Sequence, residues 1–282
     1  MLSIIAASLF RIQPDHSKEV GVPDYLTLCE QAARAGGQAL LSWIGRFEVR
    51  EKGPSDLVTQ ADCASQEAIR QVLLTAFPQH VFISEEEEGR LDSTAEYCWV
   101  VDPLDGTTNY VHQLPHYAVS IALVQRGRPI AAVVLDPVHD ECFTAAEGRG
   151  AHLNGRPIHT SQVRDLSQAL VAASFSAKVL AGSPEIDQFL AALLACQAVR
   201  RTGSAALNLC YVAAGRLDAF WALSTKAWDV AAGVLLVEEA GGVVTRLDGG
   251  PLGLELPHPV ASATLPLHEQ FRILLQSAVR SS

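Results

Sequence analysis

The sequence lacks the basic residues that a nucleic-acid-binding protein needs. Only 21 of its 282 residues are Lys or Arg, against 31 Asp or Glu, so the formal charge is −10 with the nine His counted as neutral. Clustered Lys and Arg are what attract phosphate backbones and anionic membranes. The balance therefore argues against a nucleic-acid or membrane partner. Alone it also argues against a phosphorylated substrate, although bound metal ions can reverse that inference.

Closely spaced cysteines are absent as well. The six cysteines are scattered and form no C-x-x-C pair: Cys29, Cys63, Cys98, Cys142, Cys196 and Cys210. A secreted disulfide scaffold would be shorter and richer in cysteine, and a thiolate zinc site needs paired ligands. We therefore expect reduced thiols, several of them buried, in a cytoplasmic protein.

No apolar run is long enough to cross a bilayer. The first ten residues are mostly apolar, but they lack the basic start of a signal peptide and Arg11 interrupts them. Residues 1–20 are interpreted as a tail outside the fold, and residues 21–282 as a single domain. With 49% hydrophobic residues, a chain of this length can bury a substantial core.

Hydrophobic patterning predicts alternating helices and strands. Apolar spacing and stop signals predict helices over 26–44, 61–77, 185–196, 204–214, 228–240 and 265–279. Short apolar runs predict strands at 81–83, 97–101, 118–124, 130–135, 142–145, 170–173, 217–222 and 243–246. Such alternation along one chain indicates an α/β fold of stacked layers.

Acidic residues stand in three places where folding alone does not require them. Glu85 comes two residues after a predicted strand, Asp102 directly follows another, Asp105 comes three residues later, and Asp229 opens an apolar helix. Each has a local explanation as a solvated loop, a turn or a helix-start charge. Strand ends, however, are where α/β folds gather ligands. With the Leu104 carbonyl, these carboxylates form the oxygen-only donor set that Mg²⁺ prefers.

The residues after Asp105 add an anion-binding feature. Gly106 and Thr107 stand at a predicted helix start, where free backbone amides bind phosphate oxygens. Four carboxylates close together would repel one another unless cations neutralised them. Metal ions, an activated water and an anion cradle together predict metal-assisted hydrolysis of a phosphate ester.

Five ordered motifs make the sequence similar to the inositol monophosphatase family. The motifs are DLVTQAD at 56–62, ISEE at 83–86, VDPLDGTTNY at 101–110, GSAALN at 203–208, and WDVAAG through EAGG at 228–242. The family belongs to a superfamily of Mg²⁺-dependent, lithium-sensitive phosphatases that includes fructose bisphosphatase. The resemblance covers about residues 25–250. It implies a layered α-β-α-β-α sandwich, in most members a homodimer.

The resemblance implies a metal centre of two to three Mg²⁺ ions. Glu85, Asp102, the Leu104 carbonyl and Asp105 would hold the first ion. Asp102, Asp105 and Asp229 would hold the second, and a third, weaker ion would lie near Glu85, which thereby serves catalysis. Through these ions Leu104, Asp105 and Asp229 would also face the substrate phosphate.

The resemblance also assigns groups to the reacting water and the substrate. Thr107, paired with Asp62, would orient and help deprotonate a water for in-line attack. The amides of Gly106 and Thr107 would bind the phosphate. The side of the substrate away from the phosphate would be lined by Gly203, Ser204 and Ala205. The local alternative for Asp62 is a helix N-cap.

Two positions bear on the choice of substrate. Inositol phosphatases typically have a Glu seven residues before the helix-start Asp, and here that residue is Ala222. Lys226 either reaches a substrate group or is a solvated Lys at the helix start. We expect inositol-1-phosphate as substrate. The alternatives are histidinol phosphate, another sugar phosphate, adenosine 3′,5′-bisphosphate, or a regulatory role through protein contacts, as in some bacterial relatives.

A serine hydrolase is a weaker alternative. The sequence has no G-x-S-x-G elbow, and no motif claims one of its histidines. His112 and His116 have a spacing that suggests metal ligands on a helix, but Pro115 argues against a helix there. We predict a loop that lines a cleft, or a packed histidine.

Overall fold

The computed structural model describes residues 24–53, 56–87, 95–176 and 178–280. The predicted tail at residues 1–20 lies outside these ranges. Side chains of residues 49–58 are also outside the description. None of the described helices is long and apolar enough to cross a membrane. All six cysteines fall within the described ranges, and no disulfide joins any of them.

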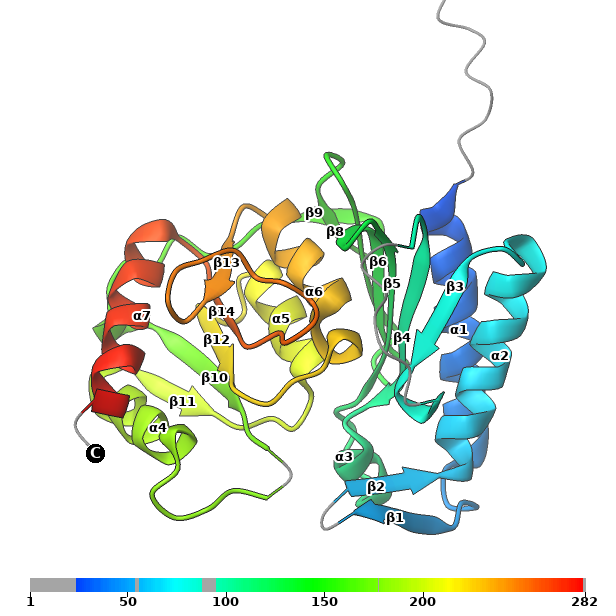
Figure 1. Ribbon diagram of the computed structural model, residues 1–282, viewed down its shortest axis with the longest axis horizontal. Coiled ribbons are helices and arrows are strands. Elements are labelled where there is room, and N and C mark those ends of the chain that lie inside the picture. The colour runs from blue at the N-terminus through cyan, green and yellow to red at the C-terminus, as the bar shows by residue number, and fades with distance from the viewer. Residues whose placement is uncertain (1–23, 54–55, 88–94, 177, 281–282) are drawn as a thin grey trace, which may run out of the picture.

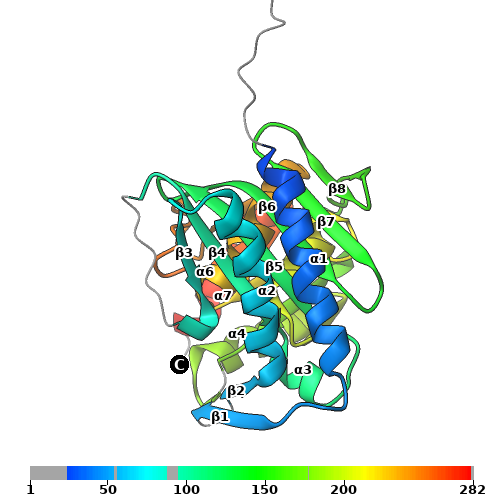
Figure 2. The ribbon, with the colours of Figure 1, turned by 90° about the vertical axis from the view of Figure 1, so that its right-hand side faces the viewer.

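Five layers of helix and sheet alternate across the molecule, as predicted (Figure 1). Two helices cover the outer face of a seven-stranded sheet, and Figure 2 shows them side by side on that face. Two helices fill the space between this sheet and a five-stranded sheet, and two more cover the far side. In this order the helices are α1 (Tyr25–Trp43) and α2 (Gln60–Ala76), α5 (Ala205–Ala213) and α6 (Ala227–Glu239), and α4 (Pro184–Ala195) and α7 (Leu265–Arg280).

The seven-stranded sheet is antiparallel except at one edge, where its first two strands run parallel. Its strands follow one another in chain order: β3 (Val81–Ser84), β4 (Cys98–Asp105), β5 (Ala118–Gln125), β6 (Arg128–Asp136), β7 (Glu141–Ala146), β8 (Ala151–Leu153) and β9 (Arg156–Ile158). Residues of β4 are buried throughout, because helices cover both faces of the sheet at this strand.

The five-stranded sheet is mixed. Its order is β11 (Ala198–Arg200), β10 (Leu170–Ser174), β12 (Ala219–Ala222), β14 (Pro259–Ser262) and β13 (Val243–Arg246). The first three strands are parallel, so the carboxyl ends of β10 and β12 meet at one edge. A separate hairpin of β1 (Val49–Gly53) and β2 (Asp56–Thr59) precedes α2.

The central helix pair is buried on nearly every side. The sequence of α6 is apolar almost throughout, which suits a helix enclosed between two sheets. Gly233 allows α5 to approach closely, since a Cβ there would lie 2.5 Å from the Leu209 side chain. Helix α6 also packs against β4, β5, β6 and β7 of the seven-stranded sheet, and the hydroxyl of Ser120 in β5 donates to the carbonyl of Trp228, next to Asp229, over 3.2 Å.

The predicted helices are confirmed to within one residue at each end. The main strands are confirmed too, but the prediction ended the second at residue 101 and β4 continues to Asp105. Its pairing with β5 shifts register between Asp102 and Asp105. Pro103, which has no N–H to give to the ladder, explains the irregularity. The strand therefore reaches its two acidic residues with a bulge between them.

Candidate active site

A cleft of about 530 Å³ lies where the ends of several strands meet. One side is formed by the end of β4 and the short helix α3 (Thr107–Val111). The other is formed by residues after β10, β11 and β12, and the start of α6 contributes as well. Ligands of α/β folds bind at such strand ends, so this cleft is the candidate active site.

The four predicted metal-binding carboxylates all line this cleft. Glu85 begins a 3₁₀ turn directly after β3, and Asp102 and Asp105 belong to the end of β4. Asp229 is the third residue of α6. Asp102 is 1% exposed and Asp105 is 8% exposed, so both reach the cleft from within the core. Residues separated by up to 144 positions are thus brought to one place.

The bulge in β4 organises the backbone between its two acids. The amide of Leu104 donates to Oδ1 of Asp102 over 3.0 Å. Its carbonyl, a predicted metal ligand, accepts a hydrogen bond of 3.1 Å from the hydroxyl of Thr107. These bonds hold the Leu104 carbonyl at the cleft beside the carboxylates.

Asp105 also caps helix α5. Its Oδ2 accepts hydrogen bonds from the hydroxyl of Ser204 and, over 2.8 Å, from the amide of Ala206. The amide of Ala205 donates to Oδ1 over 3.3 Å. Ser204 is fully buried and is not among the residues that line the cleft; its hydroxyl also accepts from the amide of Leu207 and caps the helix. Gly203 and Ala205 line the cleft on either side of it.

Burial and mutual repulsion disfavour the charged forms of these acids. The pKa of Asp102 is raised well above its usual value, first by burial and then by the charges of Glu85, Asp105 and Asp229. Burial, followed by the charge of Asp105, also raises the pKa of Asp229. Burial raises the pKa of Asp105 to about 6, although its hydrogen bonds to Ser204 and the α5 amides act in the opposite direction.

This donor set fits Mg²⁺ in its chemistry. Carboxylates and a backbone carbonyl are hard oxygen ligands, and a cation would relieve the repulsion that raises the pKa of Asp102. Among the described residues, no three His, Cys, Asp or Glu side chains already converge into a closed metal site. Two of the carboxylates instead accept hydrogen bonds at helix starts: Asp105 from the hydroxyl of Ser204 before α5, and Asp229 Oδ2 from the amide of Lys226 over 2.8 Å.

Asp62 lies in a capping box at the start of α2. Its Oδ2 accepts from the amide of Thr59 over 2.8 Å and from the Thr59 hydroxyl over 2.6 Å. Asp62 is therefore the third helical residue and Thr59 the N-cap, which corrects the local alternative for Asp62. Its Oδ1 is buried and has no described hydrogen-bond partner. Burial raises the pKa of Asp62 to about 6.

The pairing of Asp62 with Thr107 stays a prediction. The described hydrogen bonds of the Thr107 hydroxyl and of Asp62 go to Leu104 and Thr59 instead. The buried Oδ1 of Asp62 remains able to accept a proton or a water hydrogen bond.

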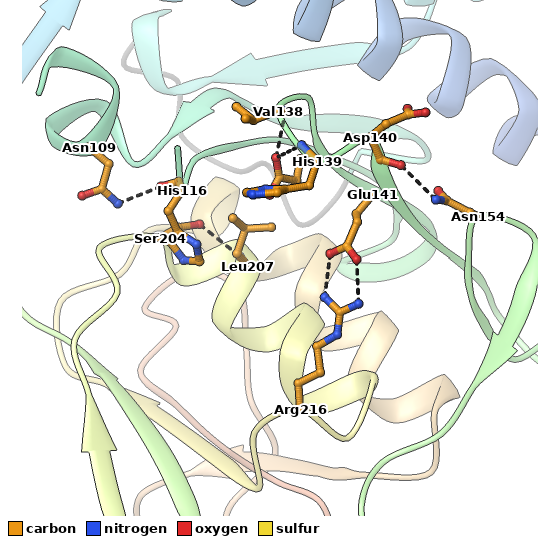
Figure 3. Close-up of polar contacts among 11 residues, drawn as sticks. Asn109, His116, Val138, His139, Asp140, Glu141, Asn154, Ser204, Leu207 and Arg216 are labelled. Carbon is orange, nitrogen blue, oxygen red and sulfur yellow. Dashed lines mark hydrogen bonds and ion pairs between the residues drawn. The ribbon is translucent and has the colours of Figure 1, made fainter. Parts of the chain in front are cut away.

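The turn that carries the predicted phosphate-binding amides needs glycine. Gly106 has φ = +96°, and a Cβ there would lie 3.1 Å from the carbonyl oxygen of His116. Asn109 fixes this turn: its Nδ2 donates to the carbonyl of His116 over 2.7 Å and to that of Thr202 over 2.9 Å. Figure 3 shows the first of these bonds. Asn109 belongs to the VDPLDGTTNY motif, but the sequence alone did not indicate this role in the turn.

Ala222 and Lys226, the two positions that bear on substrate choice, lie near the start of α6. Ala222 is buried at the end of β12, opposite Ser174 of β10. Lys226 is exposed at the start of α6. Sequence reasoning missed other residues that line the cleft after β10, β11 and β12, namely Phe175, Ser176, Arg201, Ser224 and Thr225. Their only sequence signal is that they follow predicted strands in an α/β pattern.

His116 lies in the loop before β5, which agrees with the prediction of a packed histidine. Its ring lies 5.7 Å from that of Tyr211, and burial lowers its pKa. The helix α3 ends before Pro115, with His112 as its C-cap.

Comparison with known proteins decides the family. The model of the inositol monophosphatase family matches residues 23–280. The chain belongs to the inositol monophosphatase family. That range includes every carboxylate of the cleft and both sheets.

Similar curated proteins carry the name Nus factor SuhB. The chain is 43% identical over 252 residues to the Nus factor SuhB of Pseudomonas aeruginosa, which covers 85% of this chain and 91% of that protein. It is 43% identical over 230 residues to the Nus factor SuhB of Escherichia coli K12, covering 80% and 86%.

Solved structures of the family share the fold. The extragenic suppressor protein suhB of Bartonella henselae has a TM-score of 0.84 and 36% identity, covering 89% of this chain and 98% of that one. The inositol monophosphatase of Anabaena has a TM-score of 0.81 and 37% identity, covering 90% and 95%.

Proposed function

We propose that this protein is a Mg²⁺-dependent phosphomonoesterase that hydrolyses a small phosphorylated alcohol, with inositol-1-phosphate as the first candidate. One observation carries the proposal: four acids from three separate segments line one cleft beside the Gly106–Thr107 turn. Membership of the inositol monophosphatase family supports it. We also propose lithium sensitivity and a cytoplasmic location, where reducing conditions suit a chain without disulfides.

The cleft residues would hold two to three ions. Glu85, Asp102, the Leu104 carbonyl and Asp105 would take the first, and Asp229 would join Asp102 and Asp105 around the second. Bound Mg²⁺ supplies water activation and neutralises phosphoryl charge. To bind it, Asp105 and Asp229 would share their carboxylates between the ions and the hydrogen bonds they make here.

Other residues would bind the ester at the cleft, and Asp62, next to it in the proposed mechanism, would accept the proton of the attacking water. The amides of Gly106 and Thr107 donate to phosphate oxygens, and Gly203 and Ala205 face the alcohol part. Asp62, with a pKa raised to about 6, is mostly ionised at pH 7 and can accept a proton passed through Thr107. For this step the Thr107 hydroxyl would turn away from the Leu104 carbonyl.

A substrate panel tests this proposal. Phosphate release would be measured from inositol-1-phosphate, histidinol phosphate, a hexose phosphate and adenosine 3′,5′-bisphosphate, with Mg²⁺ and with a chelator. We expect metal-dependent release from at least one ester, lost in Asp229→Asn. Asp140→Asn is the matched control, because Asp140 is an exposed acid. If no ester released phosphate, or if release did not depend on Mg²⁺, the proposal of a Mg²⁺-dependent phosphatase would be rejected.

A regulatory role through protein contacts is the second candidate. The names of the similar Nus factor proteins favour it, and a net charge of −10 leaves protein partners of the transcription machinery open. Pulldown from a bacterial lysate with Asp229→Asn separates the two functions. Stoichiometric recovery of transcription proteins by wild type and variant alike would favour the regulatory role.

A homodimer is part of the proposal. Helix α4 exposes an apolar face made of Leu190, Leu193 and Leu194, the last 88% exposed, and such faces are typical of protein interfaces. Sedimentation equilibrium should give twice the chain mass of 30.2 kDa. A single-chain mass at micromolar concentration would reject the dimer.

A further inference from the structure

Two backbone segments that contribute to the cleft, one after each sheet, approach each other closely. The first is the Gly106–Thr107 turn after β4, and the second is loop 201–204, between β11 and α5. A Cβ at Gly106 would lie 3.3 Å from the carbonyl oxygen of Gly203, so the two backbones are nearly in contact. Under the proposed function, their separation would determine how a phosphate bound at the turn lies in the cleft.

The side chain of Asn109 joins these two segments. Asn109 is the third residue of α3 and is 9% exposed. Its Nδ2 donates over 2.9 Å to the carbonyl of Thr202, in loop 201–204, and over 2.7 Å to the carbonyl of His116, in the loop before β5. Gly203 packs against the same carboxamide, since a Cβ there would lie 2.8 Å from Nδ2. One side chain therefore connects the short helix after the turn with two loops.

The chemistry of this contact requires a carboxamide. A primary amide nitrogen carries two hydrogens, whereas a carbonyl oxygen only accepts. The two carbonyls therefore use both hydrogens of Nδ2 of Asn109, which determines the orientation of the side chain. An aspartate would place an oxygen against the carbonyls, and a leucine of similar shape would offer no donor. Among side chains of this size, only asparagine can make both bonds.

The loop that Asn109 contacts is itself held by α5. The hydroxyl of Thr202 donates over 2.8 Å to Oδ1 of Asn208, which is fully buried in this helix. At the end of the loop, the hydroxyl of Ser204 donates to Asp105. The turn is thus tied to this region from both sides, by Asp105 before it and by Asn109 after it. The first contact uses a carboxylate that would hold Mg²⁺, and the second uses an uncharged group.

We propose that Asn109 is a positioning residue that holds the Gly106–Thr107 turn against loop 201–204 and so sets the phosphate-binding geometry of the cleft, independently of metal binding. This inference rests on the proposed phosphatase function and adds a residue to the same site. The amides of the turn are the groups that would touch the phosphate, and Asn109 acts through their backbone.

Two substitutions of Asn109 test this role against a matched control. Asn109→Leu keeps the shape and removes both donors, and Asn109→Ala removes them without adding bulk. The control is Asn154→Ala. Asn154 is exposed, does not line the cleft, and also bonds twice to the backbone: it accepts from the amide of Cys142 over 2.8 Å and donates to the carbonyl of Asp140 over 2.9 Å. Figure 3 shows both asparagines.

Amide hydrogen exchange tests the contact itself. Both Asn109 variants should speed exchange in the segments 106–114 and 202–207 together, because each segment loses the same support, and should leave the amide of Cys142 unchanged. Asn154→Ala should do the reverse. Faster exchange in only one of the two cleft segments of the Asn109 variants, or in neither, would show that this side chain does not hold them together and would overturn the inference.

Ester kinetics separate positioning from a general loss of stability. For inositol-1-phosphate we expect kcat/KM of both Asn109 variants to fall by about 10- to 100-fold, mainly through KM. The Mg²⁺ concentration for half-maximal release should stay within about twofold, because the carboxylates keep their own hydrogen bonds. Asn154→Ala should lower the melting temperature and keep kcat/KM within about twofold. A loss of Mg²⁺ affinity as large as the loss in kcat/KM, or an equal loss in Asn154→Ala, would give Asn109 a purely structural role.

Binding of inorganic phosphate keeps this inference separate from the phosphatase proposal, because it requires no turnover. Calorimetric titration with phosphate in the presence of Mg²⁺ should give a Kd at least about 10-fold higher for both Asn109 variants than for wild type and Asn154→Ala. That result would support the positioning role even if no ester were hydrolysed. Equal Kd values in all four proteins, or no binding to wild type, would overturn it even if the phosphatase proposal held.

Discussion

Asp105 has two roles, because it lines the cleft and also anchors the start of helix α5. Its carboxylate lines the cleft and at the same time accepts the hydroxyl of Ser204 and two amides at the start of α5. A carboxylate at a helix start is favoured by the helix dipole. The charge that would hold Mg²⁺ is therefore kept in place by a helix from a different part of the chain.

Asp105→Asn should separate these two contributions when compared with Ser204→Ala. The Asn variant loses the charge, and we expect metal-dependent phosphate release to fall by at least about 100-fold. Ser204→Ala removes a cap and should cost about 1 kcal/mol of unfolding free energy. It leaves the charge of Asp105, so release should fall far less. Phosphate assays and urea unfolding check both, and equal activities in the two variants would contradict this assignment.

Gly203→Ala should disturb the cleft through the backbone. Gly203 has φ = +91°, and an added Cβ would lie 2.8 Å from the Asn109 side chain that fixes the Gly106 turn. We expect a loss of about 1–3 kcal/mol of stability and a higher KM. Gly148→Ala is the control: it also has a positive φ, but a Cβ there meets nothing within 4 Å. A Gly203 variant no worse than that control would show that the Asn109 contact is unimportant.

The sequence predicts the acids of the cleft better than their contacts. Asp102 and Asp105 could be recognised because they end an apolar strand within four residues of each other. The bond between Asp105 and Ser204 spans 99 residues, and no local pattern encodes it. The walls after β10 and β12 were missed for the same reason, since serine and phenylalanine after a strand are ordinary loop residues.

At the scale of elements, α7 is held to the five-stranded sheet by a buried histidine. His268 is 2% exposed, and its ring nitrogens lie 3.1 Å from the Ser262 hydroxyl and 2.9 Å from the Thr245 hydroxyl. Burial, and secondarily the charge of Arg272, lowers the pKa of His268 to about 4. The neutral ring is thus the form that the fold accommodates.

This histidine makes the fold sensitive to acid. Because the folded pKa is below the unfolded value, the unfolded chain takes up the proton first as pH falls. The contribution of His268 is complete above about pH 6.5 and is lost progressively down to about pH 4, at a cost of roughly 2–3 kcal/mol. Urea unfolding of His268→Gln should show less pH dependence in this window than wild type. The exposed His159→Gln should match wild type, and identical slopes in all three proteins would contradict the assignment.

The long strands were predicted from the sequence, whereas the shortest strands were not. Long apolar segments such as β5 and β6 are clear in the sequence. β8, β9 and β11 have three residues each, too few for an alternating pattern to appear. β14 is a four-residue segment that is buried between neighbours, and it begins with a proline, which usually argues against a strand.

At the scale of the whole molecule, the cleft is formed by residues from two different layers of the fold. Glu85, Asp102 and Asp105 come from the edge of the seven-stranded sheet, whereas Asp229 comes from the helical layer between the sheets. A cation shared among them would neutralise repulsion across that junction. The net charge of −10 would then be compatible with a phosphate ester, because under the proposed function the acids of the cleft would carry bound Mg²⁺.

Mg²⁺ should stabilise the folded protein, and more so at higher pH. The raised pKa values of Asp102, Asp105 and Asp229 mean that the metal-free fold is favoured at low pH and loses stability as pH rises through the folded values, about 6 for Asp105. Bound cations remove that loss. The Mg²⁺-induced rise in melting temperature should therefore increase between pH 5 and 8 and vanish with a chelator. A rise that is independent of pH would show that these acids do not bind the metal.

Phosphate release from inositol-1-phosphate during a Mg²⁺ titration, compared between wild type, Asp229→Asn and Asp140→Asn, tests the central claim most directly. The account predicts saturable, metal-dependent release by wild type and by Asp140→Asn, and a loss of at least about 100-fold in Asp229→Asn. Release that does not depend on Mg²⁺, or that Asp229→Asn leaves unchanged, would contradict it.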